Sequence, residues 1–186
     1  MAIGKKELEN VLAENEVRRA AISGEYDPMR GIGCYGERRK YSGQRWGENG
    51  VWLPVAMVED ENFSWNMKKS DYMLMRFRYD FEYWCACCVK IMNKKTHRMD
   101  SFVLNRAQRK FLGVLERQRC SGRPVRVIVL KARQWGASTL TQIYMAWWQL
   151  VLFENCDAVI GCHHKDTSHT IQTMYNRLLD NYPCDD

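Results

Sequence analysis

The residues from Lys131 to Leu140 bring together two cations, one glycine and two neighbouring hydroxyls, a combination suited to holding phosphate. They follow a β-branched apolar run, Val125–Leu130, and precede an apolar segment, Leu140–Phe153, with helical character. Where a strand, a glycine-containing loop and a helix follow one another, backbone N–H groups and the positive end of the helix dipole point at an anion. The sequence therefore predicts a phosphate-binding loop between a strand and a helix.

The loop departs from the standard pattern G-x-x-x-x-G-K-[ST] in the position of its cation. Gly136 takes the place of the second glycine and Ser138 that of the hydroxyl that holds Mg²⁺, but Ala137 stands where the lysine belongs. A phosphate site needs a positive charge near the β- and γ-oxygens, and either Lys131 or Arg133 can supply it. The alternative interpretation is an ordinary helix that begins with Ser138 as its cap.

Three segments together resemble the large terminase subunit of tailed phages, the ATPase motor that packages DNA into procapsids. The run VIVLKARQWGASTLTQIYMAWWQ, residues 127–149, is similar to the deviant Walker A segment of that family. Residues 102–109, FVLNRAQR, resemble the upstream segment in which a glutamine contacts adenine. Residues 158–164, with the helix expected after them, resemble the second strand and helix. The resemblance covers about residues 70–183.

This resemblance implies that the chain binds ATP and Mg²⁺, with Ser138 as the metal-binding hydroxyl. It implies partners as well: double-stranded DNA, the portal protein and the small terminase subunit, in the cytoplasm of a bacterial host. The nucleotide-binding residues that it implies are Lys131, Arg133, Gln134, Gly136, Ala137, Ser138 and Thr139, together with Gln108 and Asn105 at the adenine edge.

The charge of the chain is concentrated in one stretch. The formal net charge is +6, and residues 68–136 hold 17 basic and 5 acidic residues. A basic patch of this kind attracts nucleic acid or nucleotide phosphates, so a non-catalytic module that binds DNA or a packaging partner is the alternative function. No apolar run reaches the roughly 18 residues that span a bilayer, and the charged N-terminus lacks the apolar core of a signal peptide. These features predict a cytoplasmic protein without a membrane partner.

The pattern of apolar residues predicts an α/β fold, the incomplete start of a P-loop NTPase. A parallel sheet with flanking helices is expected in residues 70–186, preceded in residues 1–69 by a helical extension and a glycine- and aromatic-rich arm. The expected helices are residues 5–22, 71–90, 105–119, 137–153 and 167–181, the expected strands are residues 125–130 and 157–163, and the arm is residues 24–54.

A hydrolytic site needs a carboxylate at the end of a later strand to order Mg²⁺. No apolar run that ends in Asp or Glu follows the loop, so the sequence offers no Walker B strand and no catalytic residue. We therefore expect ATPase activity of a full-length parent and none of this chain alone. A fragment, a truncated reading frame and one piece of a split gene remain as alternatives.

Overall fold

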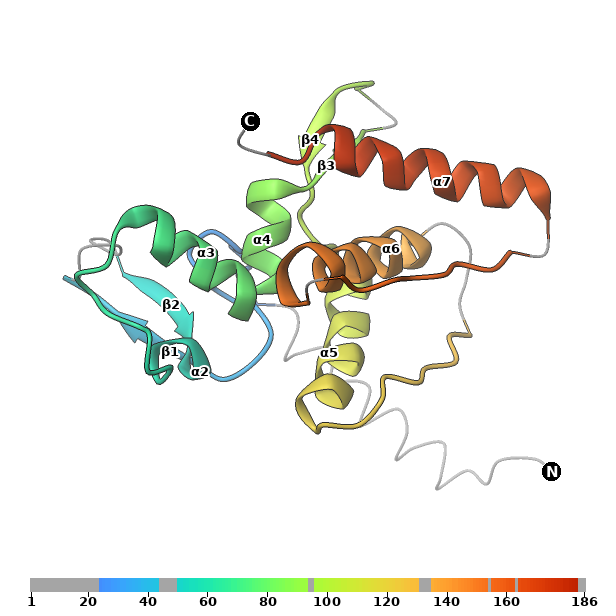
Figure 1. The fold of residues 1–186 in the computed structure, drawn as a ribbon. Coiled ribbons are helices and arrows are strands. Elements are labelled where there is room, and N and C mark those ends of the chain that lie inside the picture. Colours follow the sequence, from blue (N-terminus) through green and yellow to red (C-terminus); the bar gives the residue numbers. More distant parts are fainter. Residues whose placement is uncertain are drawn as a thin grey trace, which may run out of the picture.

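The computed structural model describes residues 24–43, 50–93, 96–130, 135–153, 155–162 and 164–183. These residues form a mixed α/β structure dominated by helices (Figure 1). The helix expected at residues 5–22 lies outside the described residues. The elements are β1 (Arg38–Tyr41), β2 (Val51–Pro54), α2 (Val55–Val58), α3 (Lys69–Tyr79), α4 (Phe81–Cys88), β3 (Lys90–Met92), β4 (Met99–Ser101), α5 (Arg106–Cys120), α6 (Ala137–Trp147), the π-helix η1 (Trp148–Leu152) and α7 (Lys165–Asp180).

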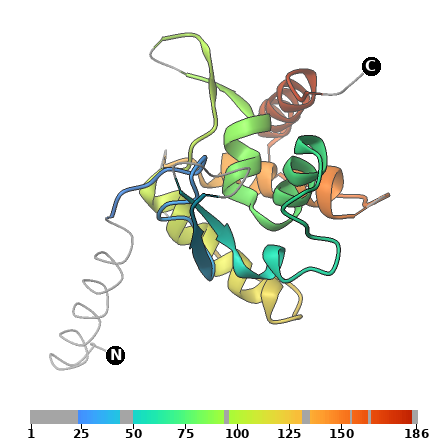
Figure 2. The same ribbon diagram turned by 90° about the vertical axis from the view of Figure 1, so that its left-hand side faces the viewer.

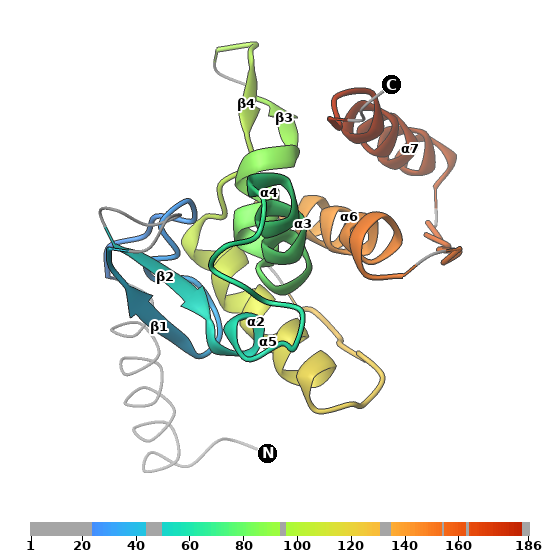
Figure 3. The same ribbon diagram turned by 60° about the vertical axis from the view of Figure 1, so that its left-hand side comes forward.

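The main core lies where α4, α5 and α6 meet (Figures 1 and 3). Trp84 and Trp147 are fully buried there, and the ring of Phe81 packs edge-on against Trp147 at a centroid distance of 5.2 Å. Aromatic side chains of this size bury 150–250 Å² each and dominate the packing energy of a core. The apolar spacing in the sequence of α4, α5 and α6 therefore reflects a core that these three helices share. The helices α5, α6 and α7 begin within two residues of their expected positions.

A buried glutamine on α6 leaves part of its hydrogen-bonding capacity unused. Both amide atoms of Gln142 are buried without a hydrogen-bond partner in the described structure. Seven residues later, Gln149 in η1 is half-buried, and its amide donates to the Cys156 carbonyl at 2.8 Å and accepts from the Tyr175 hydroxyl at 2.7 Å. The two glutamines therefore differ in hydrogen bonding: the side-chain amide of Gln149 has two partners, and that of Gln142 has none in the described structure.

We predict that Gln142→Met raises the free energy of unfolding by about 1–2 kcal/mol, because methionine fills a similar volume without two unpaired polar atoms. Gln149→Met, the control, should lower it by a similar amount because it breaks two hydrogen bonds. Urea denaturation followed by tryptophan fluorescence measures both changes. A Gln142→Met protein that unfolds at a lower urea concentration than the wild type would show that the amide is satisfied in solution.

The helix expected at residues 71–90 is in fact two helices, α3 and α4, because the chain breaks at Asp80. The backbone of Asp80 has φ −132° and ψ 83°, outside the helical region, and its carboxylate accepts a hydrogen bond from the backbone N–H of Tyr83 at 3.2 Å. Aspartate favours such a capping position over a helix interior. Two arginines hold the buried carboxylate: Arg38 binds both of its oxygens at 2.9 Å and Arg76 binds one at 3.2 Å.

Residues 24–54 were expected to form an irregular arm, and the described part of this segment is more ordered than that. β1 and β2 pair as an antiparallel hairpin that packs with α2 and α3 around a second core of Val51, Leu53, Met57 and Tyr72 (Figure 2). Gly31 allows the close approach, since a Cβ there would lie 2.0 Å from the carbonyl oxygen of Trp52. The Arg38–Asp80 ion pair joins this hairpin to α4 across the expected boundary at residue 70.

The expected start of a parallel sheet is wrong for the described residues, whose two sheets, β1–β2 and β3–β4, are both antiparallel. Residues 125–130 and 155–162 run without strand pairing (Figure 1). At Arg126, a side chain satisfies the backbone groups that a neighbouring strand would otherwise bind. The side-chain amide of Gln118 accepts a hydrogen bond from the Arg126 N–H at 2.7 Å and donates one to the Arg126 carbonyl at 3.2 Å. The apolar side chains of Ile128 and Leu130 are fully exposed.

Candidate functional site

The first turn of α6 lies where the sequence predicts the phosphate-binding loop. Gly136 is the N-cap residue, with φ 85° and ψ 25° in the left-handed region, and the helix begins at Ala137. Ala137 is buried, Thr139 is half-buried and Ser138 is exposed. A helix leaves its first N–H groups without partners inside the helix, and among the described residues Gly136, the N-cap, has no side chain to cap them. The described part of the predicted loop therefore presents an uncapped helix N-terminus with an exposed hydroxyl beside it.

Three residues of the predicted site, Lys131, Arg133 and Gln134, lie outside the described residues. The residue after them, Trp135, is described, and its ring packs edge-on against Phe111 of α5 at a centroid distance of 5.9 Å. Trp135 thus anchors the loop on α5. The choice between Lys131 and Arg133 as the phosphate-binding cation stays open.

Asn105 and Gln108, which the resemblance places at the adenine edge, lie directly beside the loop. The Asn105 side chain donates to the carbonyl of Trp135 at 3.1 Å, and the Gln108 side chain donates to the carbonyl of Gly136 at 3.1 Å. Both residues also form the cap of α5. Asn105 accepts from the backbone N–H of Gln108 at 3.0 Å, and Gln108 accepts from the backbone N–H of Asn105 at 2.9 Å.

These contacts bring the N-termini of α5 and α6 together. Each N-terminus carries a partial positive charge from its helix dipole, so two positive ends meet at the Trp135–Gly136 peptide. The pattern Asn-x-x-Gln at positions 105–108 is typical of a capping box. This pattern in the sequence could have indicated that the two amides cap α5. The structure thus gathers six predicted site residues at one place: Asn105, Gln108, Gly136, Ala137, Ser138 and Thr139.

Further along α6, a polar network fixes this helix against α5. The Tyr144 hydroxyl donates to Glu116 at 2.6 Å, and Arg119 donates to the same carboxylate at 2.8 and 2.7 Å. Burial, together with the charge of Glu116, raises the pKa of Tyr144, so the hydroxyl remains a donor at neutral pH. With α6 held at Gly136 and at Tyr144, the helix N-terminus has a fixed direction relative to α5.

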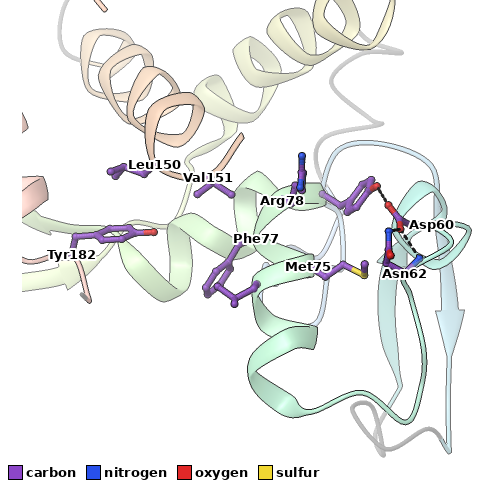
Figure 4. A pocket seen from close by; sticks show the side chains of 10 residues that line it. Asp60, Asn62, Met75, Phe77, Arg78, Leu150, Val151 and Tyr182 are labelled. Atoms are coloured by element: carbon purple, nitrogen blue, oxygen red, sulfur yellow. Dashed lines mark hydrogen bonds between the residues drawn. The ribbon is translucent and has the colours of Figure 1, made fainter. Parts of the chain in front are cut away.

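A pocket of about 420 Å³ lies at the other end of α6, between α3 and η1 (Figure 4). Phe77, Val151 and Tyr182 supply apolar surface, and Asp60 accepts hydrogen bonds from Tyr79 and Asn62. Since α6 rises about 1.5 Å per residue, its 11 residues separate this pocket from Gly136 by roughly 16 Å. The pocket contains none of the predicted site residues, so it is distinct from the loop.

In the described ranges, no three His, Cys, Asp or Glu side chains gather in a group that could hold a metal ion. Of the helices in the same ranges, none has the length and apolar character needed to cross a membrane. No protein-family model matches the chain, and no curated protein and no solved structure matches it.

Proposed function

We propose that the chain binds the phosphates of ATP at the start of α6. The observation that carries the proposal is Gly136, a left-handed N-cap residue whose carbonyl is tied to the N-terminus of α5 by Gln108. The backbone N–H groups at a helix N-terminus are already oriented before a ligand arrives, so they bind anions without rearrangement. The exposed Ser138 hydroxyl is suited to hold Mg²⁺, an ion that commonly takes few protein ligands and completes its shell with water and nucleotide phosphates.

The ligand's negative charge needs a cation, which we assign to Lys131 or Arg133. Arginine offers a flat fork of donors that binds two phosphate oxygens, whereas lysine acts as a point charge. Gln108 and Asn105 position the loop through their contacts with Gly136 and Trp135. Each side-chain amide group has a second hydrogen, and this is the atom with which it would meet the adenine edge.

The parent function that fits this site and the resemblance is that of a terminase large subunit with a P-loop NTPase fold. This chain is then its N-terminal, ATP-binding portion, and the motor moves double-stranded DNA into procapsids with the portal protein and the small subunit, in the host cytoplasm. Walker B and the catalytic residues belong to other segments of that motor, so we expect ATP binding by this chain without turnover.

The alternative is a non-catalytic module that binds DNA or a packaging partner through its basic surface. The observation in its favour is α5, on which Arg106, Lys110 and Arg117 are exposed within 12 residues. Phosphate contacts of this kind give an affinity that falls steeply with salt. The two functions therefore predict different dependence on nucleotide and on salt.

We predict that Mg²⁺–ATP raises the thermal unfolding temperature of the wild-type chain, since a ligand at 100 times its Kd adds about 2.7 kcal/mol. Lys131→Ala and Arg133→Ala should each reduce this shift, one of them strongly, and Ser138→Ala should remove the benefit of Mg²⁺. The matched control is Lys110→Ala, a cation on α5 outside the loop, which should keep the full shift. An unchanged shift in both loop variants would contradict the site, and salt-sensitive DNA binding with no nucleotide effect would favour the alternative.

A further inference from the structure

The first part of the arm, from Tyr26 to Arg38, is fastened to the helices by polar contacts. Arg38 binds the buried carboxylate of Asp80, at the start of α4, through two hydrogen bonds of 2.9 Å. From α3, Arg76 donates to the carbonyl of Pro28 at 3.3 Å. From α5, Arg109 stacks over the Tyr26 ring at 4.2 Å and donates to the carbonyl of Gly33 at 3.4 Å. The arm therefore contacts α3, α4 and α5.

One contact of the arm differs from the others because it depends on a carboxyl group that is buried without a cation bound to it. Glu82 of α4 is 2% exposed. Its Oε2 accepts a hydrogen bond from the backbone N–H of Tyr35 at 2.6 Å. The buried hydroxyl of Tyr26 also faces Glu82 from the arm and favours its ionised form, although neither this hydroxyl nor Glu82 Oε1 makes a hydrogen bond of regular geometry in the described structure. A single backbone N–H does not replace the hydration of an ionised carboxylate.

The charged and titratable groups around Glu82 come from each element packed against it. The arm contributes Tyr26, Cys34 and Arg38, α4 contributes Asp80 and Cys85, and α3 contributes Arg76, while Arg109 of α5 lies behind the Tyr26 ring. Arg38, whose charge acts on Glu82, is bound to Asp80, and so is Arg76. Burial raises the pKa of both thiols and of Tyr26, so these groups stay neutral up to pH 8.

We propose that the arm is a pH-dependent clamp that closes on α4 and α5 while Glu82 is protonated and loosens when Glu82 ionises. A neutral carboxyl still accepts the Tyr35 N–H, more weakly than an anion does, but it has a far smaller desolvation cost. An ionised carboxylate gains hydration only when the arm moves away. The ion pair of Asp80 with Arg38 and Arg76 is charged throughout this range and holds the arm independently of Glu82.

The direction of the effect follows from the change in pKa on folding. Burial, and after it the charge of Asp80, raises the pKa of Glu82 from 4.5 to about 7, against the Tyr35 and Tyr26 hydrogen bonds and the charge of Arg38, which lower it. A carboxyl whose pKa is raised in the closed state stabilises that state fully at pH below 4.5. The stabilisation falls as the pH rises from 4.5 to about 7 and is lost above it. If opening hydrates Glu82 fully, the opening constant of the arm increases on the order of 50-fold between pH 5 and pH 8.

Hydrogen–deuterium exchange of the full chain at pH 5 and pH 8, corrected for intrinsic exchange with an unstructured reference, measures this constant. The arm peptides should lose protection at pH 8 by that factor, while peptides from α6 change little. Glu82→Gln keeps an acceptor for the Tyr35 N–H without the titration, so its arm should be equally protected at both pH values. Glu116→Gln removes a different buried carboxylate and should keep the wild-type pH dependence.

Two results would overturn the clamp. One is a wild-type arm with the same opening constant at pH 5 and pH 8. The other is a pH dependence of the arm that survives in Glu82→Gln, which would place the titrating group elsewhere. Both results are readable without any nucleotide or DNA, so the clamp and the proposed function are tested independently.

Discussion

Asp80→Ala is expected to lower the free energy of unfolding by about 3–5 kcal/mol, a large share of the 5–15 kcal/mol that stabilises a typical domain. The carboxylate of Asp80 has no exposed surface, and it is the partner of both Arg38 and Arg76, whose side chains are 7% and 3% exposed. Removing it leaves two buried guanidinium groups without their anion. The substitution also removes the cap of α4, a loss of about 1 kcal/mol in comparable helices.

The pH dependence of this variant provides a second check. Burial alone raises the pKa of Asp80, but the charge and hydrogen bonds of Arg38 and the charge of Arg76 outweigh burial and leave the pKa below its usual value. A carboxylate with a lowered pKa stabilises the fold above about pH 4, and that stabilisation is lost as the pH falls through the native pKa. The difference in stability between wild type and Asp80→Ala should therefore shrink in acid.

Urea denaturation at pH 7 and pH 3 measures both effects. The matched control is Asp71→Ala, an exposed aspartate in the first turn of α3, which should change the free energy of unfolding by less than about 1 kcal/mol. An Asp80→Ala protein within 1 kcal/mol of wild type at pH 7 would mean that water reaches and hydrates the two arginines.

The sequence was sufficient to locate the long helices because their evidence is local. Periodic apolar residues place α5, α6 and α7, and each of these helices buries apolar side chains, with Leu112, Leu140 and Leu178 as examples. The break at Asp80 was missed for a different reason. The residues around it read as continuous helix, and the feature that ends α3 is an ion pair with Arg38, 42 residues earlier in the chain.

The expected strands were also missed because their pairing depends on residues elsewhere in the chain. Val125–Leu130 has the β-branched composition of a buried strand, but a strand needs a second backbone, and the composition of one segment does not specify it. In the described structure, Gln118 takes the place of that second backbone at Arg126. At the candidate site, the glycine and the hydroxyls were predictable from the motif. The tie between α5 and α6 through Gln108 was not, because it joins residues 28 positions apart.

Gly136→Ala is expected to destabilise the fold by about 2–4 kcal/mol, from two separate causes. At φ 85° a side chain adds strain of about 1–2 kcal/mol, since left-handed backbone places Cβ against the carbonyl. In addition, a Cβ at this position would lie 2.6 Å from the amide nitrogen of Gln108, which is 4% exposed and bound to the Gly136 carbonyl. Moving Gln108 would break the bond that joins the N-termini of α5 and α6.

Gly122→Ala separates the two causes, because Gly122 has φ 68° and open space around the position of a Cβ. It should show the backbone strain alone, about 1 kcal/mol. The excess of Gly136→Ala over Gly122→Ala is the cost of displacing Gln108, and it should disappear in the Gln108→Ala background, where the clashing amide is absent. Urea denaturation of the four variants completes this cycle. Equal costs for the two glycine substitutions would mean that Gln108 yields freely and does not hold the loop in place.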